Sequence, residues 1–119
     1  MMWSPSCRLF PVALAILLPL TSPADSGRYE REVAPVFAAH CVSCHGPTKQ
    51  KAGLRLDSPS GLRNGSDGGS IFLAGKPEES LLYQVVAGLH ETLTMPPKGD
   101  PLSEVERQAI QGWIASGAA

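Results

Sequence analysis

The chain has no surplus of charge of either sign and very little cysteine. Its 119 residues carry 10 basic and 11 acidic side chains, for a formal net charge of −1, and only 3 residues are cysteines. Proteins that bind nucleic acid concentrate positive charge on one face, so this balance argues against that class. Beyond residue 24, no apolar run approaches the roughly 20 residues of a membrane-spanning helix. We therefore expect no nucleic-acid partner and no stable membrane span beyond that point.

The sequence also lacks the patterns of common catalytic sites. No serine or cysteine has the neighbours of an activated nucleophile. The glycine-rich stretch 61–69 lacks the Lys-Ser/Thr ending of a phosphate-binding loop. Asp57 and Glu91 are far apart in the chain, and we interpret them as surface groups. We expect that the protein is not an enzyme.

The first residues have the order of an export signal. Arg8 supplies a positive charge, Leu9–Leu20 is apolar but too short to span a bilayer, and Thr21–Ala24 offers small residues for cleavage. We predict a cleaved signal peptide over residues 1–24 and one mature domain over residues 25–119. That domain would lie in the periplasm or elsewhere outside the cytoplasm. An uncleaved N-terminal anchor is the alternative.

The run Cys41-Val42-Ser43-Cys44-His45 has the C-x-x-C-H spacing of a c-type haem attachment site. Two thiols one helical turn apart can each add to one vinyl group of a porphyrin and form two thioether bonds. The histidine that follows then lies under the ring and can bind the iron from one side. The pattern predicts one covalently attached haem c, held by Cys41 and Cys44, with His45 as the proximal axial ligand.

Two other structures could use the same residues. Cys7 precedes the apolar run and should leave with the signal, so Cys41 and Cys44 are the remaining thiols. They could form a disulfide in a small binding module, but so tight a loop removes little entropy from the unfolded chain. A zinc site of both cysteines and His45 lacks a clear fourth ligand.

The second axial ligand is predicted to be Met95. It is the only methionine beyond Met2, and two prolines follow it that would stiffen its loop. A thioether sulfur is a soft, neutral donor that raises the reduction potential relative to a second histidine. The alternative is that Met95 only fills the core.

Two further histidines compete for the same position. His40 directly precedes Cys41, where a helix turns it away from the face of His45, and we interpret it as a surface or propionate-side residue. His90 follows a predicted helix and could reach the iron only if its loop folded differently.

Hydrophobic periodicity predicts an all-α domain of about three helices joined by long loops around the haem. A capping box at Ser103 to Glu106 marks the start of the last helix. The predicted elements are an extended segment over 28–32, a helix over 33–39, a long loop over 46–70 with one turn at 59–62, a helix over 77–87, and a helix from 103 to 117.

A haem also offers a means of stabilising so short a chain. If it covers about 500 Å² of apolar surface, burial at about 25 cal/mol per Å² gives an upper estimate of about 12 kcal/mol. This is comparable to the whole stability of an ordinary domain. We predict that the haem-free protein is largely unfolded.

The order of these motifs resembles a class I cytochrome c and, more specifically, the planctomycete-type cytochrome c domain. The resemblance implies covalent haem at Cys41 and Cys44, axial ligation by His45 and Met95, and packing of the first helix on the last. The matching stretches are Val33–Phe37, His40–Pro47, Gly53–Ser58, Gly75–Leu82, Met95–Gly99 and Trp113–Ala118, and the residues implied to pack at the crossing are Phe37 and Trp113.

One departure from this family concerns the group that orients the histidine ring. The chain after His45 lacks the Gly-x-Gly-Pro run of many small cytochromes c. The carbonyl that holds the histidine ring is therefore left open between Pro47 and another residue.

We expect an exported monohaem cytochrome that transfers single electrons between redox partner proteins by cycling Fe(III)/Fe(II). The alternative is a haem-based enzyme or sensor with an open sixth coordination position, such as a peroxide-reducing centre.

Overall fold

The computed structural model describes residues 11–17 and 26–119. Residues 11–17 form neither helix nor strand and are exposed. The rest of the predicted signal peptide lies outside the described residues, so the export signal stays a prediction. In the described part of the chain, no helix has both the length and the apolar character to cross a membrane.

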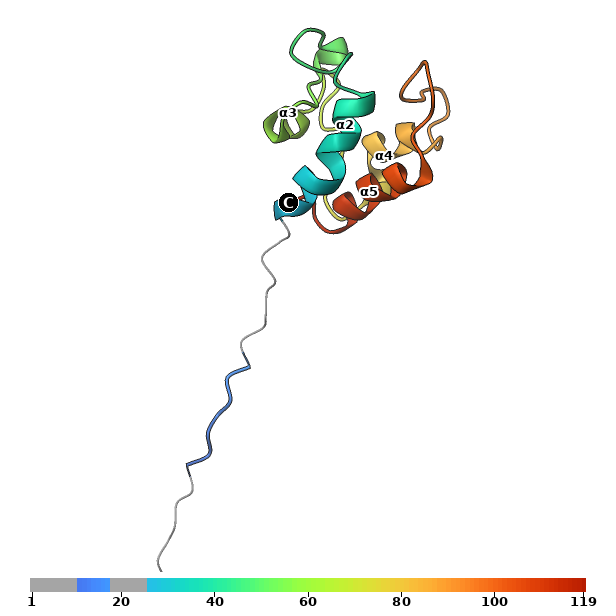
Figure 1. The fold of residues 1–119 in the computed structure, drawn as a ribbon. Coiled ribbons are helices and arrows are strands. Elements are labelled where there is room, and N and C mark those ends of the chain that lie inside the picture. Colours follow the sequence, from blue (N-terminus) through green and yellow to red (C-terminus); the bar gives the residue numbers. More distant parts are fainter. Residues whose placement is uncertain (1–10, 18–25) are drawn as a thin grey trace, which may run out of the picture.

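The described residues form helices and no strand, which confirms the predicted all-α class (Figure 1). In Figure 1, α2 lies between α3 on one side and the pair α4 and α5 on the other. The elements are α1 (Ser26–Arg28), the π-helical turn η1 (Tyr29–Val33), α2 (Ala34–His40), the 3-10 turn η2 (Lys51–Gly53), α3 (Pro59–Asn64), the 3-10 turn η3 (Pro77–Glu79), α4 (Leu81–Val86) and α5 (Glu104–Ala115).

The first helix begins earlier than the sequence predicts. Residues 28–32, expected to be extended, belong to one helical run formed by α1, η1 and α2. Tyr29 and Val33 are both buried and lie one turn apart, which gives this segment an apolar face. Within the same run, Arg28 Nε donates to Glu32 Oε2 at 2.8 Å. Burial of Tyr29 and Val33 on one side of the segment thus favours a helix over the predicted extended conformation.

Aromatic residues join the first helical run to α5. Phe37 and Trp113 are both buried, and Tyr29 contacts each of them, with ring centroids 6.3 Å and 5.5 Å apart. Trp113 also contacts Phe72 at 5.6 Å. α5 packs mainly on η1, so Tyr29 mediates the packing of the first and last helices.

The predicted helix over 77–87 is interrupted at Ser80. Here the backbone is extended (φ −91°, ψ 121°), and the segment divides into η3 and α4. The Ser80 side chain is fully buried, accepts from the N–H of Leu73 at 2.9 Å and donates to the carbonyl of Lys76 at 2.7 Å. Ser80 thus bonds to the preceding loop at the point where a continuous helix would need regular helical bonds. The prediction of one continuous helix over 77–87 is therefore wrong.

The predicted turn at 59–62 and the predicted start of the last helix are both capped by side chains. Ser58 caps α3 by accepting from the N–H of Gly61 at 3.1 Å, so the predicted turn is a short helix within the long loop. At α5, the side chains of Ser103 and Glu106 form the reciprocal bonds of a capping box. This confirms the predicted start of the last helix.

Candidate functional site

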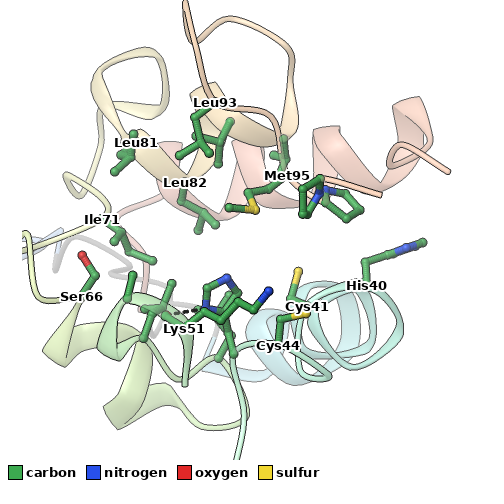
Figure 2. Close-up of a pocket in the computed structure, with 18 of the residues that line it drawn as sticks. His40, Cys41, Cys44, Lys51, Ser66, Ile71, Leu81, Leu82, Leu93 and Met95 are labelled. Carbon is green, nitrogen blue, oxygen red and sulfur yellow. Dashed lines mark hydrogen bonds between the residues drawn. The ribbon is translucent and has the colours of Figure 1, made fainter. Parts of the chain in front are cut away.

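A cavity of about 520 Å³ separates two parts of the domain (Figure 2). One wall comes from the end of α2 and the segment that follows it, and the other comes from α4 and the loop after it. The volume lies in the range of small-molecule and cofactor sites. Most of the lining is aliphatic, including Leu54, Leu56, Ile71, Leu82, Val85 and Val86.

The C-x-x-C-H residues occupy tight helical turns at the end of α2. The N–H groups of Cys41 and Val42 both donate to the carbonyl of Phe37, at 2.9 and 3.0 Å. The N–H groups of Cys44 and His45 then both donate to the carbonyl of Cys41, at 3.2 and 2.9 Å. This winding brings Cys41, Cys44 and His45 to the same cavity wall.

Both thiols are free in the structure. Burial, followed by the neighbouring Cys44 and Glu106, raises the pKa of Cys41 to about 11. The Cys41 thiol is therefore neutral at physiological pH in the folded chain. Among the described residues, no three His, Cys, Asp or Glu side chains form a group that could hold a metal ion by themselves, so a zinc site gains no support.

The ring of His45 is held by the backbone of η2. His45 Nδ1 lies 3.0 Å from the carbonyl oxygen of Lys51. A carbonyl only accepts, so Nδ1 carries the proton and Nε2 keeps its lone pair for a metal. The dashed line in Figure 2 marks this bond. The carbonyl left open by the sequence thus belongs to Lys51 and not to Pro47.

Short backbone bonds hold Lys51 in place for this role. Its N–H donates to the carbonyl of Cys44 at 3.0 Å, and the N–H of Gly46 donates to the carbonyl of Lys49 at 2.7 Å. The N–H of Leu56 reaches back to the carbonyl of His45 at 2.8 Å. The loop after the motif therefore folds back and fixes the imidazole.

Met95 lies on the opposite wall. Figure 2 shows its side chain across the cavity from the two cysteine sulfurs. The N–H of Met95 donates to the carbonyl of Val85 at 2.9 Å. That carbonyl belongs to the last turn of α4, where carbonyl groups lack a partner within the helix. Met95 is thus attached to the end of α4 by its own backbone.

The two competing histidines have other partners. His40 Nε2 lies 2.7 Å from Glu106 Oε2 of α5, and Figure 2 shows the His40 side chain directed away from Met95. His90 is not among the described residues that line the cavity, and its Nδ1 accepts from backbone N–H groups of its own loop. Neither arrangement favours ligation by these residues.

Charge at the cavity is of one sign. Lys51 and Lys98 are among its lining residues, whereas the described lining residues include no aspartate or glutamate. Glu106 lies outside the cavity, where the backbone N–H of Ser103 and, to a smaller extent, His40 hold the pKa of its carboxyl below the usual 4.5.

Three contacts at this site have no counterpart in the sequence patterns. The carbonyls of Lys51 and Val85 and the pairing of His40 with Glu106 join segments that the chain separates. Backbone carbonyls have no sequence signature, so no motif could have indicated the first two.

The family model described as Planctomycete cytochrome C matches residues 41–99. The match begins at the first cysteine of the motif and ends just after the Met95 loop. No curated protein and no solved structure shows significant similarity to the chain.

Proposed function

The chain belongs to the planctomycete cytochrome C family through residues 41–99, and from this premise we propose that it is an exported monohaem electron carrier. Cytochrome c domains bind haem and transfer electrons, and they typically act outside the cytoplasm. The predicted signal peptide over residues 1–24 would provide the export. Redox partner proteins would supply and accept the electron.

The observation that carries this proposal is the arrangement of four side chains around one apolar cavity. Cys41, Cys44 and His45 line one wall, and Met95 lines the other. The two thiols would hold a haem c covalently, and His45 and Met95 would ligate its iron from opposite sides. A bound haem supplies the one-electron redox chemistry, and the protein supplies orientation and polarity.

The residues of the two walls have distinct tasks in such a carrier. The Lys51 carbonyl keeps the His45 ring in one orientation, and the Val85 carbonyl restrains the backbone of Met95. Ligands that keep their positions in both oxidation states allow electron transfer with little rearrangement. Lys51 and Lys98 line the cavity and would supply positive charge for the carboxylates of a bound haem.

A haem enzyme with an open sixth position is the alternative function. Such catalysis requires polar side chains above the iron. Apart from Lys98, the described lining of the Met95 wall is instead apolar and includes Leu82, Val85 and Leu93. This apolar lining supports the carrier over the enzyme.

Production of the chain in cells that mature c-type cytochromes tests the proposal. Mass spectrometry is expected to give the mass of residues 25–119 plus one haem, and the Cys41→Ala/Cys44→Ala variant should lack the added mass. A mature wild-type protein with the mass of its amino acids alone would refute the proposal.

Met95→Ala tests the ligand on the second wall. Loss of the thioether removes a donor that favours Fe(II), so the reduction potential should fall and the ferric protein should bind added cyanide readily. Spectroelectrochemistry and cyanide titration measure the two effects. Spectra identical to wild type would assign the sixth position to another group.

A further inference from the structure

We propose that His90 is a positioning residue that holds the loop presenting Met95. This inference rests on the proposed ligation by Met95. His90 Nδ1 accepts from two backbone N–H groups, those of Thr92 at 3.3 Å and Leu93 at 3.0 Å. Its side chain is half-buried and lies outside the cavity.

The loop between α4 and Met95 is attached at both of its ends. At the start, Gly88 has a positive φ of 72°, and the N–H of Leu89 donates to the carbonyl of Gln84 at 2.9 Å. This is the bond of a Schellman helix end. At the finish, the N–H of Met95 donates to the carbonyl of Val85 at 2.9 Å. Both ends are therefore fixed on the last turn of α4.

The middle of the loop depends on His90. Within the described chain, the two bonds to its Nδ1 are the hydrogen bonds that hold residues 90–94. Backbone N–H groups only donate, so Nδ1 must offer its lone pair and the ring proton lies on Nε2. The imidazole thereby defines the path of the segment that leads to the sulfur.

The geometry is that of an Asx turn with a histidine in the asparagine position. Asparagine and aspartate side-chain oxygens accept from N–H groups two and three residues further along the chain. Thr92 and Leu93 stand in those positions relative to His90. An asparagine at position 90 should therefore restore the turn, whereas a phenylalanine keeps an aromatic ring but has no acceptor.

Without these two bonds, the loop should depart from its path more often. The Met95 sulfur should then dissociate more often from the iron that it is proposed to bind. Cyanide binding to the ferric holoprotein reports this release, because cyanide needs the position that Met95 would occupy. We expect His90→Phe to raise the cyanide affinity about thirtyfold, the size expected when two hydrogen bonds of ordinary net strength are lost. His90→Asn should bind cyanide as wild type does.

The experiment compares the cyanide affinities of four ferric holoproteins: wild type, His90→Phe, His90→Asn and Met95→Ala. Met95→Ala gives the affinity without a competing sulfur. Restoration by His90→Asn separates the acceptor role from a general loss of packing, and from ligation by His90 itself.

Two results would overturn the inference while leaving the proposed function intact. In one, Met95→Ala binds cyanide more tightly than wild type, but His90→Phe matches wild type. In the other, His90→Asn behaves as His90→Phe does. If wild type already binds cyanide as tightly as Met95→Ala, Met95 does not hold the sixth position and the inference fails with that premise, whereas the mass measurement decides the proposed function separately.

Discussion

Gly46 directly follows the proposed iron ligand His45, and the backbone leaves no room there for a side chain. An alanine Cβ at this position would overlap the carbonyl oxygen of Val42. The turn from the C-x-x-C-H motif into the loop would have to open, and the bond from His45 to the Lys51 carbonyl would be disturbed.

We expect Gly46→Ala to lower the free energy of unfolding of the holoprotein by about 1–3 kcal/mol, the usual cost of overpacking. Denaturant unfolding measures the change. Gly68→Ala is the matched control, because a Cβ there would lie at ordinary contact distance from Ser66 Oγ, at 3.6 Å. Equal stability of the two variants would contradict the argument.

At the scale of single residues, the sequence indicates which side chains could bind a haem. It does not indicate which groups hold those side chains in position. The spacing of Cys41, Cys44 and His45 and the position of Met95 indicate a haem chemistry directly. The orientation of His45 depends on a carbonyl of Lys51, whose side chain plays no part in that bond. Such a contact arises from the path of the loop and is visible only in three dimensions.

At the scale of elements, the break between η3 and α4 depends on one buried hydroxyl. Ser80→Ala would leave the N–H of Leu73 without its partner. The fully buried Ser80 hydroxyl also loses its bond to the carbonyl of Lys76. Because each such bond contributes about 0.5–1.5 kcal/mol, we expect a loss of about 1–3 kcal/mol in the free energy of unfolding. Ser60→Ala is the control, since Ser60 is exposed and its hydroxyl makes only an exposed bond, to Ser58 Oγ at 3.2 Å. Thermal unfolding of both holoproteins gives the comparison, and a Ser80 variant as stable as the control would refute it.

Glu106 joins two elements, because one carboxyl caps α5 and pairs with His40 at the end of α2. Glu106→Ala removes both contacts and should cost about 1 kcal/mol or more. Glu106→Gln keeps a capping acceptor but loses the charge, so its effect should be smaller. Thermal midpoints of the three holoproteins at neutral pH measure the order.

The same variants give a pH dependence. The pKa of Glu106 is lowered in the folded state, so the carboxylate stabilises the fold above its usual pKa of 4.5. This contribution is lost as the pH falls through the lowered pKa. The difference in thermal midpoint between wild type and Glu106→Gln should therefore shrink between about pH 7 and about pH 3. A difference that is constant across this range would show that the charge does not contribute.

Periodicity located the helices better than it located their limits. The apolar stripe of α5 and its capping box were sufficient to predict that helix. The early start at Ser26 and the break at Ser80 were missed, because Tyr29 and Ser80 are fixed by partners from distant or neighbouring segments. Local propensity contains no information about such partners.

At the scale of the whole molecule, the cavity separates the C-x-x-C-H wall from the wall formed by α4 and the Met95 loop. Without a haem, the aliphatic lining of both walls would face water or collapse. We expect the Cys41→Ala/Cys44→Ala chain, purified free of haem, to show no cooperative thermal transition by circular dichroism, whereas the holoprotein unfolds cooperatively. A sharp transition in the haem-free chain would show that the protein scaffold is stable by itself.

Both proposed ligands are restrained through main-chain carbonyl groups, at Lys51 and at Val85. Main-chain groups persist when a side chain is exchanged. Related sequences can therefore vary at these two positions, changing the charge near the cavity or the packing of α4, while the coordination of the iron stays the same. The redox potential could in this way be tuned during evolution without redesign of the metal centre.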